Sequence, residues 1–258
     1  MRVALLQFSA GTDSALNRKT IDGLVGRLAD GPPVDLVVAP EGSMHDFGTI
    51  DHDLGAAAEP LDGPFVGALA EHAARLHATV VAGMFERNGD GLPWNTLVVM
   101  APDGTLAATY RKVHLYDSFG YTESERLSAG DIKPVTLEVG GLRLGLMTCY
   151  DLRFPEYARL LVDEGAEALV VPSAWVAGPL KEDHWGTLLR ARAIENTTYV
   201  LGAGQCGATY TGCTAVVDPL GVVVAAAGHD EAVVTADLEP DRIARARQRN
   251  PSLANRRM

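Results

Sequence analysis

The stretch Leu142–Glu156, LRLGLMTCYDLRFPE, joins an apolar run to a polar turn and then to the start of a helix. The run up to Met147 has the composition of a buried strand, and Pro155 suits the first turn of a helix. Cys149 therefore stands at a strand-to-helix junction, where backbone N–H groups and the positive end of a helix favour a thiolate. A buried structural cysteine is the alternative, and this stretch alone favours neither role.

The composition is ordinary for a soluble globular protein. Of the 258 residues, 47% are hydrophobic and 21% are charged, and the formal net charge is −11. This acidic balance argues against a nucleic-acid or anionic-membrane partner, because binding phosphate requires a basic face. No apolar stretch is long enough to span a bilayer, and the N-terminus shows no export signal. Cys149, Cys206 and Cys213 lack metal-site spacing, and their odd number predicts free thiols in the reducing cytoplasm.

Apolar runs of strand length alternate with segments of helical period along the chain. Strands are expected at 2–8, 35–39, 79–85, 168–171, 199–204 and 232–238, and hairpins at 95–112, 135–147 and 214–227. Helices are expected near 13–28, 64–73, 155–164, 185–193 and 241–248. Two mixed sheets, each covered on its outer face by helices, fit this order and predict a four-layered α-β-β-α sandwich. No linker marks a boundary, so one domain is expected over 1–258, with a docking tail from about residue 240.

Two segments between these elements are expected to be loops. The segment 115–130 has no clear periodicity and has the length of a functional loop. The segment 43–63 carries His45 and His52 among aspartates, but their spacing matches no metal signature, and a solvated acidic loop is expected. The chain has no dinucleotide or P-loop motif, and no helix pattern follows the glycine-rich residues 202–207. These patterns therefore provide no convincing metal-binding or phosphate-binding set.

Three ionisable residues follow apolar strands. Glu41 comes after DLVVAP, Lys112 ends TLAATYR, and Cys149 ends LRLGLMT. In layered α/β folds the carboxyl ends of strands line the site crevice. A carboxylate, an ammonium and a thiol that meet there provide a base, an oxyanion stabiliser and a nucleophile. Each residue alone has a common structural explanation, but the three together favour a catalytic site.

The chain resembles the nitrilase (carbon–nitrogen hydrolase) superfamily over essentially its whole length. The resemblance is carried by VVAPEG at 37–42, YRKVHLYD at 110–117 and CYDLRFPE at 149–156, in the order that the family shows. It implies that Glu41, Lys112 and Cys149 form the family's Glu–Lys–Cys triad. It also places an additional active-site glutamate at Glu123, with Glu125 as the alternative for that role.

The resemblance also implies a mechanism. Glu41 is expected to take the proton of Cys149, whose thiolate attacks an amide carbonyl and forms a thioester. The ammonium of Lys112 and the backbone N–H of Tyr150 are expected to hold the oxyanion. Glu123 is expected to orient Lys112 or the substrate. Ammonia or an amine leaves, and Glu41 then activates the water that hydrolyses the thioester. The implied mechanism needs no metal or organic cofactor.

The substrate is expected to be a small amide that bears a carboxylate. CYDLRFPE, with HWGTLLRARAIEN downstream, is similar to the omega-amidase and deaminated-glutathione amidase branch of the superfamily. Arg153 is expected either to clamp the substrate carboxylate or to pair with Glu156 or another structural carboxylate, and the structural pair is the commoner role. Trp175 and Tyr150 are expected to be pocket walls, with core packing as the alternative.

Other functions and features stay open at this stage. An N-carbamoyl amine or amino-acid amidohydrolase is the alternative enzyme, and a catalytically silent binding protein is less favoured because the four site residues are intact. The resemblance implies a homodimer or larger homo-oligomer. Related sequences usually have proline where Ala129 stands, and often histidine and serine in place of Cys213-Thr214; the sequence offers no physical explanation for these departures.

Overall fold

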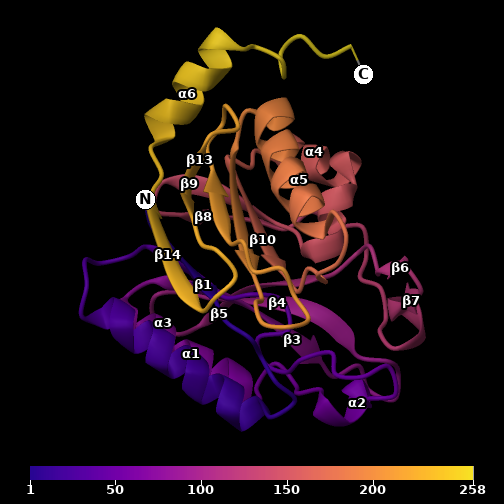
Figure 1. Cartoon of the computed structure of the whole chain (residues 1–258). Helices are drawn as coiled ribbons and strands as arrows, with labels where there is room; N and C mark the ends of the chain where they lie inside the picture. The colour runs from indigo at the N-terminus through magenta and orange to yellow at the C-terminus, as the bar shows by residue number, and fades with distance from the viewer. Residues whose placement is uncertain (258) are drawn as a thin grey trace.

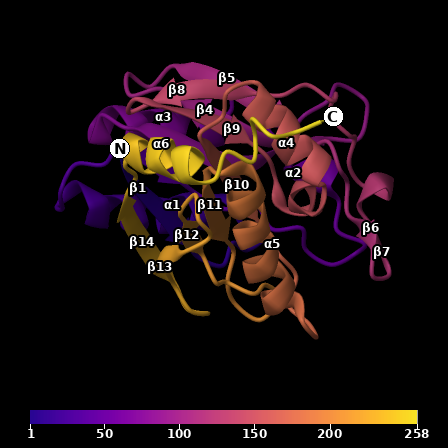
Figure 2. The ribbon, with the colours of Figure 1, turned by 90° about the horizontal axis from the view of Figure 1, so that it is seen from above.

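Two six-stranded sheets pack face to face, and helices cover the outer face of each sheet (Figures 1 and 2). The structure is a computed structural model that describes residues 1–257. From one side to the other, the layers are helices, first sheet, second sheet and helices. The predicted four-layered α-β-β-α sandwich is therefore confirmed.

The first sheet has the strand order β14-β1-β2-β3-β4-β5. Its strands are β1 (Arg2–Gln7), β2 (Leu36–Val38), β3 (Thr79–Glu86), β4 (Trp94–Met100), β5 (Leu106–Arg111) and β14 (Ala232–Asp237). Strands β1, β2 and β3 are parallel, and β4 and β14 run antiparallel to their neighbours. Because β5 reverses again, it ends at the same edge of the sheet as β2. Helices α1 (Ser14–Ala29) and α3 (Pro64–Leu76) cover the outer face.

The second sheet repeats this plan with the order β13-β12-β11-β10-β9-β8. Its strands are β8 (Thr136–Val139), β9 (Leu142–Leu146), β10 (Ala168–Ser173), β11 (Tyr199–Gly204), β12 (Ala215–Val217) and β13 (Val223–Ala226). Strands β9, β10 and β11 are parallel, and the outer strands form antiparallel hairpins. Helices α4 (Pro155–Asp163) and α5 (Lys181–Asn196) cover its outer face.

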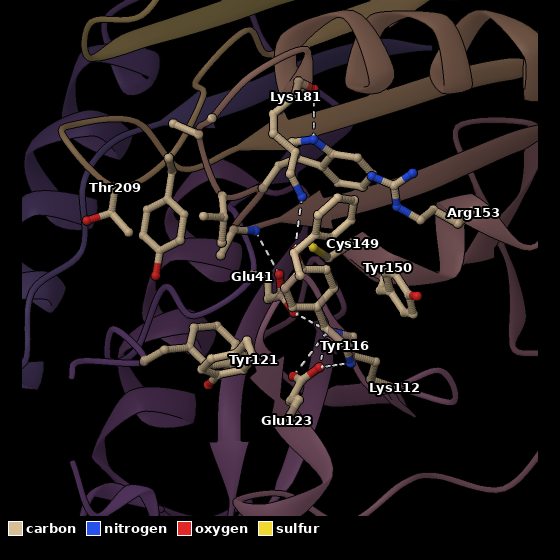
Figure 3. Close-up of a pocket in the computed structure, with 18 of the residues that line it drawn as sticks. Glu41, Lys112, Tyr116, Tyr121, Glu123, Cys149, Tyr150, Arg153, Lys181 and Thr209 are labelled. Carbon is tan, nitrogen blue, oxygen red and sulfur yellow. Dashed lines mark hydrogen bonds and ion pairs between the residues drawn. The ribbon is translucent and has the colours of Figure 1, made fainter. Parts of the chain in front are cut away.

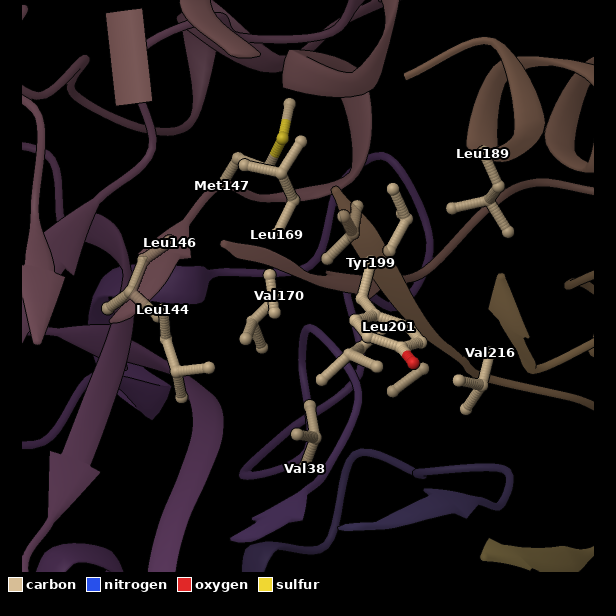
Figure 4. Packing of buried hydrophobic residues seen from close by; sticks show 14 of the residues in the cluster. Val38, Leu144, Leu146, Met147, Leu169, Val170, Leu189, Tyr199, Leu201 and Val216 are labelled. Carbon is tan, nitrogen blue, oxygen red and sulfur yellow. The ribbon is translucent and has the colours of Figure 1, made fainter. Parts of the chain in front are cut away.

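Successive side chains of β1 pack alternately into the two apolar clusters that hold the layers together. Val3 and Leu5 belong to the apolar cluster between the two sheets, whereas Ala4 and Leu6 belong to the cluster under α1 and α3. Successive side chains of a strand point to opposite faces, so a strand that is buried on both faces is apolar throughout. Figure 4 shows Val38 of the first sheet pointing toward Leu201 of the second, within the cluster that joins the sheets.

The segment 115–130 contains more regular structure than the sequence predicts. A short hairpin forms between β6 (Asp117–Ser118) and β7 (Tyr121–Thr122), and a 3₁₀ turn, η1 (Glu123–Glu125), follows it. Two-residue strands are too short to produce a period that a sequence pattern could reveal. The hairpin stands beside the end of the sandwich where the parallel strands finish (Figure 1).

The prediction of a solvated loop at 43–63 is wrong at its beginning. His45 is only 4% exposed, and its ring stacks on His52. The amide of Asn17 on α1 donates to the Met44 carbonyl, and Arg126 donates to the carbonyl of His52. These contacts satisfy backbone groups that a solvated loop would leave to water, so the loop packs against α1. The loop also contains a short helix, α2 (Leu54–Ala57).

The C-terminal helix α6 (Pro240–Arg249) lies outside the two sheets, close to the N-terminus (Figures 1 and 2). Its Ile243 is buried in the cluster that joins the sheets, and Arg242 pairs with the buried Asp218. Farther along, Arg256 pairs with Asp163 of α4. The described part of the tail therefore packs on its own chain, and docking onto a second copy stays a prediction. Within residues 1–257, no helix has the length and apolarity needed to cross a membrane.

Candidate active site

A pocket of about 490 Å³ opens at the end of the sandwich where β2, β5 and β9 finish. Its lining includes Glu41, Lys112, Glu123 and Cys149, which come from loops far apart in the sequence (Figure 3). Within residues 1–257, no three His, Cys, Asp or Glu side chains are grouped so that they could hold a metal ion. The structure thus brings together the four side chains that the sequence analysis selected.

Lys112 lies between two carboxylates at the bottom of the pocket. Its Nζ is 2.9 Å from Oε1 of Glu41 and 2.8 Å from Oε2 of Glu123, and all three side chains are at most 2% exposed. Burial acts to lower the pKa of Lys112, but the two carboxylates outweigh it and hold that pKa well above its usual value. Burial also raises the pKa of Glu123, against the attraction of Lys112. Lys112 therefore stays a cation at neutral pH.

Both carboxylates are fixed by further donors. The Asn95 amide donates to Oε1 of Glu41 at 2.7 Å and to Oε1 of Glu123 at 3.3 Å. The backbone N–H of Ala174 donates to the other oxygen of Glu41 at 2.7 Å, and that of Tyr116 donates to Glu123 at 2.6 Å. Sequence reasoning missed Asn95, although a buried amide at the start of the otherwise apolar strand β4 is an available signal.

The loop that carries Glu41 reaches the pocket because β3 has a glycine beside it. A Cβ on Gly83 would lie 2.7 Å from the Cα of Glu41, which is closer than atoms can approach. The backbone carbonyl of Glu41 also accepts a hydrogen bond from the side chain of Gln205, which directly follows β11 of the second sheet. Glu41 is thus held by both sheets, and the glycine-rich residues 202–207 support this loop.

Cys149 begins a 3₁₀ turn, η2 (Cys149–Arg153), with a φ of 46°. A left-handed conformation is costly for a residue with a side chain, and such strain concentrates at functional sites. Burial raises the pKa of the thiol well above its usual value, and the neighbouring Glu41 raises it further. The turn was expected to favour a thiolate, but these two effects outweigh that preference, so Cys149 rests as a neutral thiol.

Asp151 holds this strained turn in place. One of its oxygens accepts hydrogen bonds from Tyr110 Oη at 2.6 Å and from the Thr148 N–H at 2.8 Å. The other accepts from the backbone N–H of His114 at 3.0 Å. Because His114 follows Lys112 by two residues, the fully buried Asp151 ties the turn of the thiol to the segment of the ammonium.

The two candidate glutamates are the first and last residues of the 3₁₀ turn η1, and their side chains have different surroundings. Glu123 is buried and contacts Lys112, whereas Glu125 is exposed and lies outside the pocket lining. The structure therefore favours Glu123 over the alternative. Ala129 is exposed nearby, and the N–H of Gly130 donates to the Lys112 carbonyl at 2.8 Å, so the loop stays anchored without a proline.

The expected ion pair between Arg153 and Glu156 does not form. No carboxylate of residues 1–257 is among the ion-pair partners of Arg153, whose Cζ instead lies 4.8 Å from the ring centre of Trp175. Arg153 is the last residue of the 3₁₀ turn η2, and its side chain lines the pocket (Figure 3).

Two expected wall residues line the pocket. Trp175 packs on Trp185 and donates from Nε1 to the Lys181 carbonyl at 2.9 Å, so it is both a wall and part of the core. The Tyr150 ring stands edge-on to Tyr116. The oxyanion role of the Tyr150 N–H stays a prediction. Cys213 and Thr214, which stand where related sequences often have histidine and serine, make structural hydrogen bonds. The Cys213 carbonyl accepts from Trp185 Nε1, and the Thr214 hydroxyl accepts from the Gly204 N–H.

The fold and the pocket define a four-layered α-β-β-α protein with a buried thiol, carboxylate and ammonium at the sheet ends. A model of the carbon–nitrogen hydrolase family matches residues 2–248. A deaminated glutathione amidase of Escherichia coli O157:H7 is 41% identical, covering 100% of this chain and 97% of that protein. Omega-amidase NIT2 of Bos taurus is 34% identical, covering 99% and 95%.

A solved structure shows the same likeness in three dimensions. Nit3 of Saccharomyces cerevisiae, a member of branch 10 of the nitrilase superfamily, has a TM-score of 0.89 at 31% identity, covering 100% of this chain and 97% of that one. The chain belongs to the carbon–nitrogen hydrolase family of the nitrilase superfamily. It is an enzyme, a carbon–nitrogen hydrolase of the amidase type.

Proposed function

We propose that the protein cleaves the amide of a small carboxylate-bearing molecule into an acid and ammonia, through a thioester on Cys149. The observation that carries this proposal is the position of Lys112, whose ammonium is shared by Glu41 and Glu123 in the pocket that contains the thiol. A nucleophile, a base and a fixed cation within one pocket suit acyl transfer. The amidase names of the related Escherichia coli and Bos taurus proteins support the same reaction class.

Acylation begins with proton transfer from the neutral thiol of Cys149 to Glu41. The sulfur then attacks the amide carbon, and the negative charge that develops on oxygen is stabilised by the Lys112 ammonium and the Tyr150 N–H. Such preorganised donors contribute about 3–4 kcal/mol each by mutagenesis. When the C–N bond breaks, Glu41 returns the proton to the leaving nitrogen, and ammonia departs from the thioester.

Deacylation repeats these steps with water as the nucleophile. Glu41 removes a proton from water, the hydroxide adds to the thioester carbon, and the sulfur leaves with the proton that Glu41 returns. The products are the carboxylic acid and the restored thiol. Glu123 keeps Lys112 charged and in position, Arg153 pairs with the carboxylate of the substrate, and Trp175 forms the wall on which that guanidinium stacks.

The first test is ammonia release from a panel of ω-amides and N-carbamoyl compounds. Wild-type protein is expected to release ammonia from carboxylate-bearing amides, without the carbon dioxide that a carbamoyl substrate would yield. Cys149→Ala is expected to abolish release, because no other group can form the thioester. Cys206→Ala is the matched control, since it removes another buried thiol outside the pocket.

Intact-protein mass spectrometry during turnover checks the intermediate. An added acyl mass on the wild type, absent from Cys149→Ala, is the expected result. Ammonia release that survives in Cys149→Ala would exclude the thioester mechanism. Carbon dioxide release from carbamoyl compounds, with no hydrolysis of ω-amides, would favour the amidohydrolase alternative.

A further inference from the structure

Lys181 places a second buried ammonium in the same pocket. It is the first residue of α5, it is 8% exposed, and the sequence analysis did not single it out. Within residues 1–257, no carboxylate forms an ion pair with its Nζ. The ammonium donates a single hydrogen bond, to Tyr116 Oη at 3.0 Å. A buried charge without a counter-ion is costly, so its retention at a pocket wall points to an anionic ligand.

The Lys181 side chain is held in place from both ends. Its carbonyl accepts from Trp175 Nε1, and its own N–H donates to the Gly178 carbonyl at 3.0 Å. The preceding Leu180 has a φ of 62°, so the chain turns sharply into α5. At the other end, Nζ lies 3.6 Å from the ring centre of Phe119. The ammonium is thus preorganised, which lowers the entropy cost of binding a ligand there.

Arg153 is the second cation on this side of the pocket. Its Cζ is 5.8 Å from the same Phe119 ring, and its buried Nε has no hydrogen-bond partner. Burial lowers the pKa of Lys181, and the nearby Arg153 lowers it further, which shows that the two charges repel each other. Figure 3 shows both cations across Cys149 from Glu123 and Lys112.

The pocket therefore has two electrostatic halves. The inner half holds two carboxylates around Lys112, where the thiol reacts, and the outer half holds Arg153 and Lys181 among aromatic rings. A single carboxylate paired with Arg153 would leave Lys181 uncompensated. A second acidic group would neutralise it, and the aromatic walls would strengthen both attractions by excluding water.

We propose that Lys181 is a specificity-determining residue, and that with Arg153 it forms a two-cation subsite for an acyl group bearing two acidic groups. The planar guanidinium suits bidentate contact with one carboxylate, and the compact ammonium suits the other. This inference rests on the proposed amide hydrolysis, because the subsite is assigned to the acyl part of the amide that Cys149 attacks.

The test compares two amides that differ by one carboxylate: glutaramate and its 2-carboxymethyl derivative. Lys181→Met removes the ammonium but keeps most of the apolar stem, and Lys19→Met on the exposed face of α1 is the control. We expect Lys181→Met to lower kcat/KM about 10- to 100-fold for the diacid, mainly through KM, and about threefold for glutaramate, because a hydrogen bond to a charged group is lost only with the diacid. Lys181→Arg is expected to recover part of the preference for the diacid. Lys19→Met is expected to leave kcat/KM for both amides unchanged.

Calorimetric binding of the two acid products, glutarate and tricarboxylic 2-carboxymethylglutarate, separates this inference from the reaction itself. If the wild type releases no ammonia from either amide, the proposed reaction fails, but weaker binding of the tricarboxylate to Lys181→Met still supports the subsite. Equal losses for both amides, or equal affinities for the tricarboxylate in the wild type and Lys181→Met, would overturn the assignment of Lys181.

Discussion

At the scale of single residues, burial and the charge of Glu41 set the protonation state of Cys149, the proposed nucleophile. Burial keeps the pKa of the Cys149 thiol high, and the negative charge of Glu41 adds to this effect, while Lys112 opposes it. A thiol that rests neutral needs a base at the moment of attack. We therefore expect the sulfur to stay protonated until Glu41 accepts its proton.

Glu41→Gln separates these two effects of the carboxylate. Removing its negative charge is expected to lower the pKa of Cys149, because burial then remains as the main effect that opposes the Lys112 ammonium. Amide hydrolysis is nevertheless expected to fall by about 10²- to 10⁴-fold, the usual contribution of a general base. Alkylation of Cys149 by iodoacetamide, followed against pH by peptide mass spectrometry, reports the thiolate. A midpoint at the same or higher pH than in the wild type would contradict this account.

Asp151 acts on the reaction through the backbone of its neighbours. Asp151→Asn is expected to lower kcat about 10- to 100-fold with little change in KM, because the strained Cys149 turn loses its anchor without losing any pocket wall. The amide cannot accept from all of the donors that face the carboxylate, so stability should also fall by about 1–3 kcal/mol. Steady-state kinetics and urea unfolding measure the two effects.

Asp117→Asn on the exposed β6 hairpin is the control for Asp151→Asn, since its side chain is outside the pocket lining. It is expected to leave both kcat and stability close to the wild type. A variant at Asp151 that raises KM while kcat holds would show that this residue serves substrate binding and does not position the thiol.

At the scale of elements, the central strands of each sheet could be predicted from continuous apolar runs, because they are buried on both faces. Both sheets were therefore predictable, and so was the edge where Glu41, Lys112 and Cys149 meet, since strands of one direction end at one edge. The short β6–β7 hairpin was not predictable, because two-residue strands carry no period.

The supporting residues of the site were harder to predict than its centre. The fold brings Asn95 to Glu41 and Lys181 to Tyr116. Neither residue belongs to a sequence motif from which its hydrogen-bond partner could be predicted. The left-handed backbone of Cys149 is likewise imposed by Asp151 and the turn, since nothing in the residue type favours it. The strand ends thus predicted which side chains meet in the pocket, whereas the hydrogen bonds that position them required the fold.

At the scale of the whole molecule, one ion pair joins the tail to the second sheet. Asp218, only 4% exposed at its side chain, lies at the β12–β13 turn and pairs with Arg242 of α6. Its burial acts to raise its pKa, but hydrogen bonds from Arg242 and from the turn amides outweigh this, so the pKa lies below its ordinary value of 3.8. A depressed carboxyl pKa stabilises the fold above that ordinary value, and the contribution is lost as the pH falls through the lower, folded value.

Asp218→Asn should therefore destabilise the molecule in a pH-dependent way. At neutral pH we expect the free energy of unfolding to fall by about 1.5–3 kcal/mol, the range for hydrogen bonds to charged groups. The difference from the wild type should begin to narrow as the pH falls below about 4, because the carboxyl of the unfolded chain then takes up a proton. It should be lost once the pH falls below the lower pKa of the folded carboxylate. Asp163→Asn, which breaks the exposed pair with Arg256, should cost less than about 1 kcal/mol. Urea unfolding of the wild type and both variants at a series of pH values measures these differences. If the difference in free energy of unfolding between the wild type and Asp218→Asn stayed constant from neutral to acid pH, the charge of Asp218 would not anchor the tail.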